Sequence, residues 1–154
     1  MLNDLLRIKK IREKAADDEV RKCRYRVELA QQDLEKSKKE LTNYQQWRVQ
    51  EENRLYEEII NAQVKQFDLD MLKQKVAQLR ERDLLLQDAI TKAEEHLEET
   101  KKQLELAQEN YRLASQAVKK FEEFIDVMRE DELKEKARIE ELELEEFTTP
   151  RNRD

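Results

Sequence analysis

Residues 72–132 read LKQKVAQLRERDLLLQDAITKAEEHLEETKKQLELAQENYRLASQAVKKFEEFIDVMREDE. Steps of four and three residues through this stretch select eighteen positions, of which fifteen are apolar. An apolar residue every 3.5 positions, sustained for eight heptads without a proline, predicts a coiled-coil helix about 90 Å long. We call these positions the C-terminal seam: Leu72, Val76, Leu79, Asp83, Leu86, Ile90, Ala93, Leu97, Thr100, Leu104, Ala107, Tyr111, Ala114, Val118, Phe121, Ile125, Met128 and Glu132.

A weaker pattern of the same kind, the N-terminal seam, precedes it. Its positions are Val20, Cys23, Val27, Ala30, Leu34, Ser37, Leu41, Tyr44, Arg48, Glu51 and Leu55. The pattern is mainly apolar up to Tyr44 and then becomes polar. Apolar residues closer to the start indicate that the same helix begins near the N-terminus. They are Leu2, Leu5, Leu6, Ile8, Ile11 and Ala15.

Composition agrees with long, well-solvated helices. The chain has 154 residues, 44% of them charged, with no glycine and one proline, and its mean hydropathy is −1.07. Without glycine, phosphate-binding loops, dinucleotide-binding turns and tight hairpins are excluded, because each needs positive φ or close backbone approach. Natural disorder is the alternative for so charged a chain, and the periodicity argues against it.

The seams predict an all-α fold, a long antiparallel two-helix coiled-coil hairpin forming a single domain over residues 1–147. Residues 62–70 lose the periodic phase, and Asp68 is a candidate N-cap. We therefore expect helix one at about 3–64, a turn at about 65–69 and helix two at about 70–146. Residues 148–154, with Pro150, form the expected disordered tail.

A turn centred near Gln66 brings together residues whose numbers sum to roughly 131–133. This register pairs Arg48 with Asp83, both charged residues at seam positions, and a charged pair can fix a register where one charge would be costly. It also sets a basic start, net +4 over residues 1–26, beside an acidic end, net −5 over residues 129–147. Helix two then overhangs helix one by about 20 residues.

Nothing in the sequence supports catalysis, a cofactor or a metal site. His96 has no ligand partner nearby, Cys23 fits a small apolar seam position, and the acidic runs fit a solvated face. We expect no enzyme activity, and no membrane insertion, because no apolar run approaches 18 residues. The single cysteine and the missing signal peptide favour the cytoplasm. The net charge of −6 argues against nucleic-acid binding.

Apolar residues outside the seams gather towards the predicted turn. They are Trp47, Val49, Tyr56, Ile60, Phe67, Met71, Leu84 and Leu85. A two-helix structure has no third layer to cover them. They either wrap around and thicken this end of the hairpin or form a partner-binding patch.

Four short segments resemble the YscO proteins of type III secretion systems. They are LRIKKIR at 6–12, YQQWRVQEENRL at 44–55, KFEEF with REDEL at 120–133, and EEF at 145–147. YscO proteins are similar to the flagellar protein FliJ, a hairpin akin to the γ subunit of rotary ATPases. The resemblance implies a central stalk between the hexameric secretion ATPase and the cytosolic domain of the export gate. It also implies recognition of export chaperones and a place at the cytoplasmic base of the bacterial apparatus.

The resemblance also implies binding residues. Those for the ATPase are Arg7, Lys9, Lys10, Arg12 and Arg21, and those for the export gate are Leu41, Tyr44, Trp47, Leu72, Val76 and Leu79. Leu72, Val76 and Leu79 lie on the C-terminal seam as well, so they cannot serve core and partner fully at once. As a stalk, the protein is expected to be a monomer in isolation.

Two other functions remain as alternatives. One is a structural coiled coil that self-associates through its apolar residues outside the seams. The other is a basic-zipper DNA binder, resembled by the cations between Arg7 and Arg26. Four acidic residues interrupt that basic stretch, and a basic-zipper helix does not fold back into a second seam.

Overall fold

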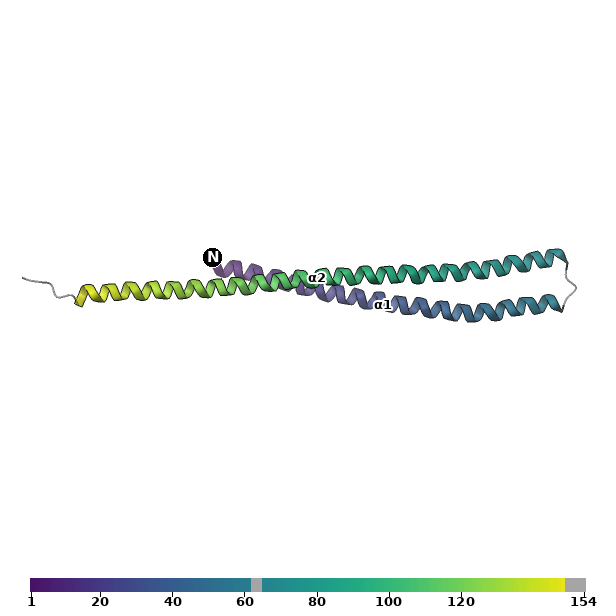
Figure 1. Ribbon diagram of the computed structural model, residues 1–154, viewed down its shortest axis with the longest axis horizontal. Coiled ribbons are helices and arrows are strands. Elements are labelled where there is room, and N and C mark those ends of the chain that lie inside the picture. Colours follow the sequence, from purple (N-terminus) through teal and green to yellow (C-terminus); the bar gives the residue numbers. More distant parts are fainter. Residues whose placement is uncertain (62–64, 149–154) are drawn as a thin grey trace, which may run out of the picture. The chain divides into compact units, whose positions relative to one another are not determined.

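The computed structural model describes residues 1–61 and 65–148. They form two α-helices and no strand: α1, Leu2–Ile60, with 59 residues, and α2, Gln66–Thr148, with 83 residues (Figure 1). The protein is therefore all-α, and the predicted helical hairpin is confirmed. Neither helix is interrupted, as expected where glycine is absent and the only proline is Pro150.

The boundaries near the connection differ from the prediction. Helix α1 ends at Ile60, four residues before the expected end, and α2 begins at Gln66, four residues before the expected start. The predicted turn at 65–69 is therefore wrong from residue 66 onward, and residues 62–64 lie outside the described part. At the other end α2 runs to Thr148, and 149–154 of the predicted tail also lie outside it.

Asp68 caps the start of α2 from within the helix, whereas the sequence predicted it as the N-cap. Its Oδ2 accepts a hydrogen bond from the backbone N–H of Lys65 at 3.3 Å. The backbone N–H groups of Asp68 and Leu69 in turn donate to the Lys65 carbonyl at 3.0 and 3.3 Å. Asp68 is thus the third helical residue reaching back to the cap position, half of a capping box, and the helix begins earlier than an N-cap at Asp68 would allow.

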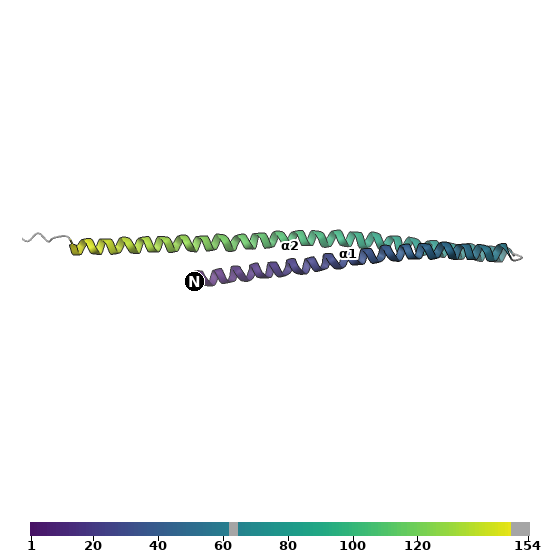
Figure 2. The same cartoon turned by 90° about the horizontal axis from the view of Figure 1, so that it is seen from below.

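The chain divides into two compact units, each made from a segment of both helices. The connection unit is Val20–Leu106, and the terminal unit combines Met1–Glu19 with Ala107–Asp154. Within the connection unit the end of α1 runs antiparallel to the start of α2, and the two segments lie together in Figure 2 as in Figure 1.

The core of the connection unit follows the two seams. One cluster packs Ala30 and Leu34 of α1 against Leu97 of α2. A second, nearer the connection, packs Leu55 against Leu72 and Val76. None of the residues at N-terminal seam positions is exposed, and among the C-terminal seam positions only Glu132 is. The heptad pattern therefore identified the core face of both helices.

In the terminal unit the core comes mainly from α2, where Ala107, Val118 and Ile125 are buried. On α1, Leu2 and Leu6 are partly covered, whereas other apolar residues of this segment are exposed. The exposed ones are Leu5, Ile8, Ile11 and Ala15. Counting back from Val20 in heptad steps gives 16, 13, 9, 6 and 2, so only Leu2 and Leu6 of the early apolar residues share the seam phase.

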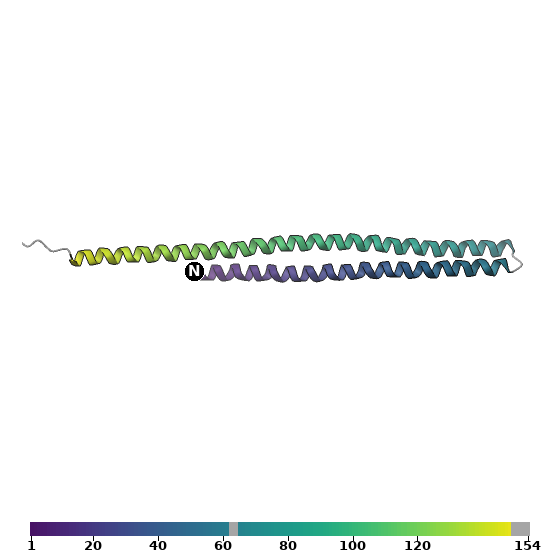
Figure 3. The same cartoon turned by 60° about the horizontal axis from the view of Figure 1, so that its bottom comes forward.

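Helix α2 continues past the first residue of α1, as Figure 3 shows. We call residues 131–148 the acidic extension, and every one of them is exposed. Its helix is supported locally, for example by the ion pair between Arg138 and Glu135 at 2.7 Å. The sequence had predicted this acidic overhang of helix two.

Candidate partner-binding site

Arg48 and Asp83 form a polar node between α1 and α2 in the connection unit. Arg48 Nη1 lies 2.6 Å from Asp83 Oδ2, so the structure brings together the two residues that the register pairs. Asp83 is only 4% exposed. A carboxylate so buried is costly without partners, and Gln45 and Gln87 also donate to its Oδ1, at 3.3 and 2.9 Å.

The node extends one helical turn towards the connection but is less well satisfied there. Arg80 Nε lies 3.6 Å from Glu52 Oε1, and Arg48 Nε lies 4.0 Å from the same oxygen. Arg48 Nε and Glu52 Oε1 are buried without a hydrogen-bond partner. The strong contact is therefore the one between Arg48 and Asp83, and the contacts that Glu52 makes with Arg48 and Arg80 are longer.

Tyr44 and Trp47 form an aromatic pair at the edge of the seam. Their ring centroids are 5.7 Å apart with the planes tilted by 39°. The Tyr44 hydroxyl donates to the Leu79 carbonyl oxygen at 2.7 Å, which anchors the pair to α2. Burial raises the pKa of the Tyr44 phenol above its ordinary value, with Asp83 adding to the effect and Arg48 opposing it. Trp47 is 49% exposed, so a large aromatic surface faces solvent.

The six residues that the resemblance assigns to the export gate are not equally accessible. Leu72 and Val76 are each 8% exposed and belong to the core cluster with Leu55. Leu41 and Leu79 are partly buried. The structure therefore brings all six into one unit, but it presents mainly Trp47, with part of Tyr44 and Leu41, on the surface.

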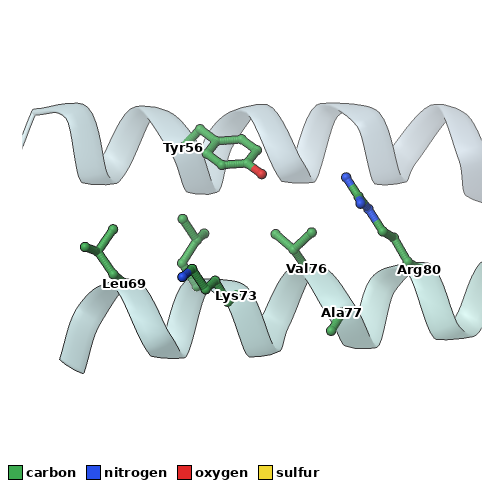
Figure 4. Close-up of a pocket in the computed structure, with 7 residues that line it drawn as sticks. Tyr56, Leu69, Lys73, Val76, Ala77 and Arg80 are labelled. Atoms are coloured by element: carbon green, nitrogen blue, oxygen red, sulfur yellow. The ribbon is translucent and has the colours of Figure 1, made fainter. Parts of the chain in front are cut away.

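A groove on the connection unit was not anticipated from the sequence. It has a volume of about 460 Å³ and is lined by Tyr56, Leu69, Leu72, Lys73, Val76, Ala77 and Arg80. Figure 4 shows the Tyr56 ring lying along α1 across from Lys73 and Val76 of α2, with the Arg80 side chain rising towards α1. Its lining is mainly apolar, and Lys73 and Arg80 are its charged members.

The groove and Trp47 lie on opposite sides of α1. Tyr56 follows Trp47 by nine residues, two and a half helical turns, which rotates the side chain by about half a circle. Tyr56 had been noted only as one of the apolar residues outside the seams. The signal that could have found the groove is that Tyr56 directly follows a seam position while Lys73 directly follows Leu72, which places both on one side of an antiparallel pair.

The basic residues assigned to the ATPase divide between the two units. Arg7, Lys10 and Arg12 are exposed in the terminal unit. Lys10 Nζ lies 3.8 Å from Glu122 Oε1, and Lys9 Nζ lies 5.5 Å from the centre of the Phe121 ring. Arg21 is also exposed but belongs to the connection unit, where it has interactions of its own.

Two kinds of feature are absent from the described ranges 1–61 and 65–148. These residues contain no group of three or more His, Cys, Asp or Glu side chains that could hold a metal ion. They also contain no helix that is long and apolar enough to cross a membrane.

Comparison with known proteins gives consistent matches over most of the chain. The family model for "Type III secretion protein YscO" matches residues 2–150. The Yop proteins translocation protein O of Yersinia pseudotuberculosis is 28% identical over 133 residues, which cover 86% of each chain. The crystal structure of the type III secretion protein YscO from Vibrio parahaemolyticus superposes with a TM-score of 0.89 at 31% identity, covering 96% of this chain and 92% of that one. The chain therefore belongs to the YscO family of type III secretion proteins.

Proposed function

We propose that the protein is the central stalk of a bacterial type III secretion apparatus, joining the hexameric secretion ATPase to the cytosolic domain of the export gate. Membership of the YscO family gives a role in type III secretion, and the stalk role goes beyond it. The proposed place of work is the cytoplasmic base of the apparatus. The chain itself would perform no chemistry and would transmit force or asymmetry between its two partners.

One observation carries the proposal: two surfaces of different chemistry occupy different units of one chain, and uninterrupted helices connect them. Basic residues are exposed on α1 in the terminal unit, and an aromatic surface is exposed in the connection unit. Helix α2 alone has 83 residues, a contour of about 120 Å. Two helices packed along a seam resist bending better than one, which suits a part that transmits force.

The export gate is assigned to the connection unit. Trp47 is 49% exposed there and stacks on Tyr44, and its neighbours Tyr44 and Leu41 are partly exposed. Trp and Tyr dominate protein–protein hot spots because they bury large areas with few rotatable bonds. The buried residues Leu72 and Val76 act in this proposal by holding the unit together, with Leu79 as the backbone anchor of Tyr44.

The ATPase is assigned to the terminal unit. Arg7, Lys10 and Arg12 project into solvent there, and Lys9 is partly covered over Phe121. Cations at the rim of an interface steer encounter and add specificity without one rigid pose, which suits contact with successive subunits of a ring. Arg21, which the resemblance also implies for the ATPase, belongs to the connection unit.

The groove beside Tyr56 supports a second candidate function, the binding of export chaperones. It is mainly apolar, has two cations in its lining, and lies on the side of α1 away from Trp47. Gate and chaperone could then occupy the connection unit on different sides. Tyr56→Ser should weaken chaperone capture from purified components while leaving gate binding unchanged; equal loss of both would contradict separate surfaces.

Pairwise binding tests the two main assignments. Trp47→Ala should weaken binding to the gate domain, with Leu29→Ala as the control because Leu29 is also exposed in the connection unit. The double variant Arg7→Glu/Arg12→Glu should weaken ATPase binding, with Lys36→Glu/Lys39→Glu as the charge-matched control. Titration calorimetry against each purified partner measures both. If each variant binds both partners as the unaltered protein does, the proposed assignment is wrong.

A further inference from the structure

Within the terminal unit, helix α2 extends beyond the first residue of α1. The first residues of α1 meet α2 at an open cavity of about 380 Å³, lined by Met1, Leu2, Asn3, Ile125, Met128, Arg129 and Glu132. Beyond this point α2 continues as helix to Thr148 with every residue exposed. The acidic extension is therefore a helix without a covering partner in its own chain, among the residues described.

The core-facing side of α2 does not end where α1 ends. Heptad steps from Ile125 and Met128 lead through 132 and 135 to Ile139, Leu142 and Glu146. Ile139, Leu142, Glu143 and Glu146 follow the i, i+3, i+4, i+7 spacing of one helix face. Ile139 is 46% exposed and Leu142 is 49% exposed. With eight acidic and three basic residues the extension carries a net charge of −5, and Ile139 and Leu142 lie beside Glu143 and Glu146 on one face of this acidic helix.

A complementary surface lies on the paired part of the same unit. Its centre is a groove of about 300 Å³ lined by Lys9, Ala117, Lys120, Phe121 and Phe124. The ammonium of Lys9 sits over the Phe121 ring, 5.5 Å from its centre. The groove thus combines an aromatic floor with two lysine cations, which fits a helix face that carries both apolar and acidic residues.

Helical spacing extends this groove into a longer face. We define the side face as the residues that directly precede seam positions: Leu5, Ile8 and Arg12 on α1, with Leu113, Ala117, Lys120, Phe124 and Val127 on α2. On an antiparallel pair these positions share one side. Lys10 and Glu122, which directly follow seam positions, form their ion pair at the other edge. All members of the side face are exposed except Ala117, which is half-buried.

We propose that the acidic extension of one molecule docks on the side face of a second copy, giving a reciprocal dimer. Ile139 and Leu142 would cover the apolar residues around Phe124, and Glu143 and Glu146 would approach Arg12 and Lys120. The extension cannot reach the side face of its own chain, because α2 is an unbroken helix from Gln66 to Thr148 and leads away from it. Docking must therefore occur between molecules.

The dimensions allow both docking events at once. The 18 residues of the extension are about 27 Å long, and residues 113–127 of the side face are about 22 Å long. Both lie consecutively on α2, so a twofold axis perpendicular to the helices sets each extension against the side face of the other copy. Such an isologous contact closes at two molecules and does not propagate into filaments.

This self-association goes beyond the stalk role and rests on the terminal unit alone. The stalk role implied by the resemblance led us to expect a monomer in isolation. The interface is small and partly charged, so we expect a reversible dimer that dissociates on dilution and in high salt. The dimer would cover Arg12, so the basic surface of the terminal unit would stay blocked until a competing partner displaces the second copy.

Sedimentation velocity of the purified full-length chain over a range of concentrations tests the proposal. The unaltered chain should shift from monomer to dimer, and Ile139→Ser/Leu142→Ser should weaken the dimer about tenfold or more. The matched control is Leu133→Ser/Leu144→Ser, two exposed leucines elsewhere around the same extension. A chain that stays monomeric at every concentration overturns the proposal, as does an equal effect of test and control variants. Circular dichroism verifies that helicity is retained in each.

Charge reversal supplies an independent arm. Arg12→Glu/Lys120→Glu and Glu143→Lys/Glu146→Lys should each dissociate the dimer, whereas Lys14→Glu/Lys119→Glu, on the opposite edge of the pair, should leave it unchanged. Mixing the two dissociated variants restores both charge pairings, because each side face meets an extension of opposite sign. Recovery of a dimer on mixing supports this docking. Failure to recover it, or a dimer that none of the reversals affects, contradicts it.

Discussion

The side chains of Arg48 and Asp83 show how a charged residue at a core position can reveal the register of two helices. Each is charged at a position where the heptad requires an apolar residue, so each alone would oppose folding. Their pairing could be expected from the register, because two such positions face each other, and the structure places their charged atoms 2.6 Å apart. The supporting roles of Gln45 and Gln87 could not, since glutamine on a solvated helix is common and its side-chain direction depends on the partner helix.

Removing one charge of this pair should cost far more than removing both. Asp83→Leu leaves the Arg48 guanidinium half-buried without its partner and should lower the free energy of unfolding by about 3–5 kcal/mol. The double variant Arg48→Leu/Asp83→Leu should recover most of this loss, since an apolar pair fits the seam. Urea unfolding followed by circular dichroism measures both. A double variant as unstable as the single one would show that the ion pair does not act as a pair.

Tyr44 should make stability depend on alkaline pH. Its pKa is raised above 10.0 in the folded chain, chiefly by burial. A raised folded pKa means that the phenol stabilises the fold fully below the unfolded pKa and loses this contribution as pH rises through the folded one. Tyr44→Phe should lose about 0.5–1.5 kcal/mol near neutrality, because the bond to the Leu79 carbonyl is gone. The difference between the two proteins should then shrink above pH 10, as urea unfolding at several pH values would show. A constant difference would contradict the assignment.

At the scale of the element, the seams predicted which side of each helix is buried, and the ends of the helices were harder to predict. Leu34 and Leu97 lie on opposite seams and share one core cluster. The start of α2 was predicted four residues too late. An Asp at the third helical position and an Asp at the N-cap give the same sequence signal, so the pattern could not distinguish them. Leu5 and Ile8 are exposed because they fall outside the heptad positions counted back along α1 from Val20. Their apolar character alone would predict that they are buried.

Core leucines of the seam should be far more sensitive than exposed ones. Leu97→Ala opens a cavity between α2 and the Ala30–Leu34 surface of α1 and should cost about 2–4 kcal/mol. Leu106→Ala, on the same helix but exposed, should change stability by less than about 0.5 kcal/mol. Thermal and urea unfolding of the two variants would compare them. Similar losses for both would mean that the cluster around Leu97 is not a core.

The cap at the start of α2 predicts a smaller effect. Asp68→Ala removes the acceptor for the Lys65 backbone N–H and should destabilise the chain by about 0.5–2 kcal/mol. Asp70→Ala, two residues further into the same first turns, is the control for lost negative charge near the helix start. Urea unfolding at neutral pH measures both, and hydrogen exchange at residues 65–69 would locate the change. An equal loss from Asp70→Ala would refute a specific cap.

At the scale of the whole molecule, the distribution of charge and the order of the helices could be predicted from the sequence. The surfaces that two helices build together could not. The basic start, the acidic end and the overhang of α2 follow from counting charges and aligning the seams. The groove beside Tyr56 and the side face beside Phe124 each combine residues that are far apart in the chain. Their shape depends on how α1 and α2 pack, so only the structure could define them.

The central claim is that one chain binds the secretion ATPase and the export gate at the same time. Capture on an immobilised export-gate domain, with the chain and the purified ATPase added together, tests it most directly. The ATPase should be retained only when the chain is present, and Trp47→Ala or Arg7→Glu/Arg12→Glu should each abolish that retention. If the two partners compete for the chain, so that adding ATPase releases it from the gate domain, the protein is not a stalk.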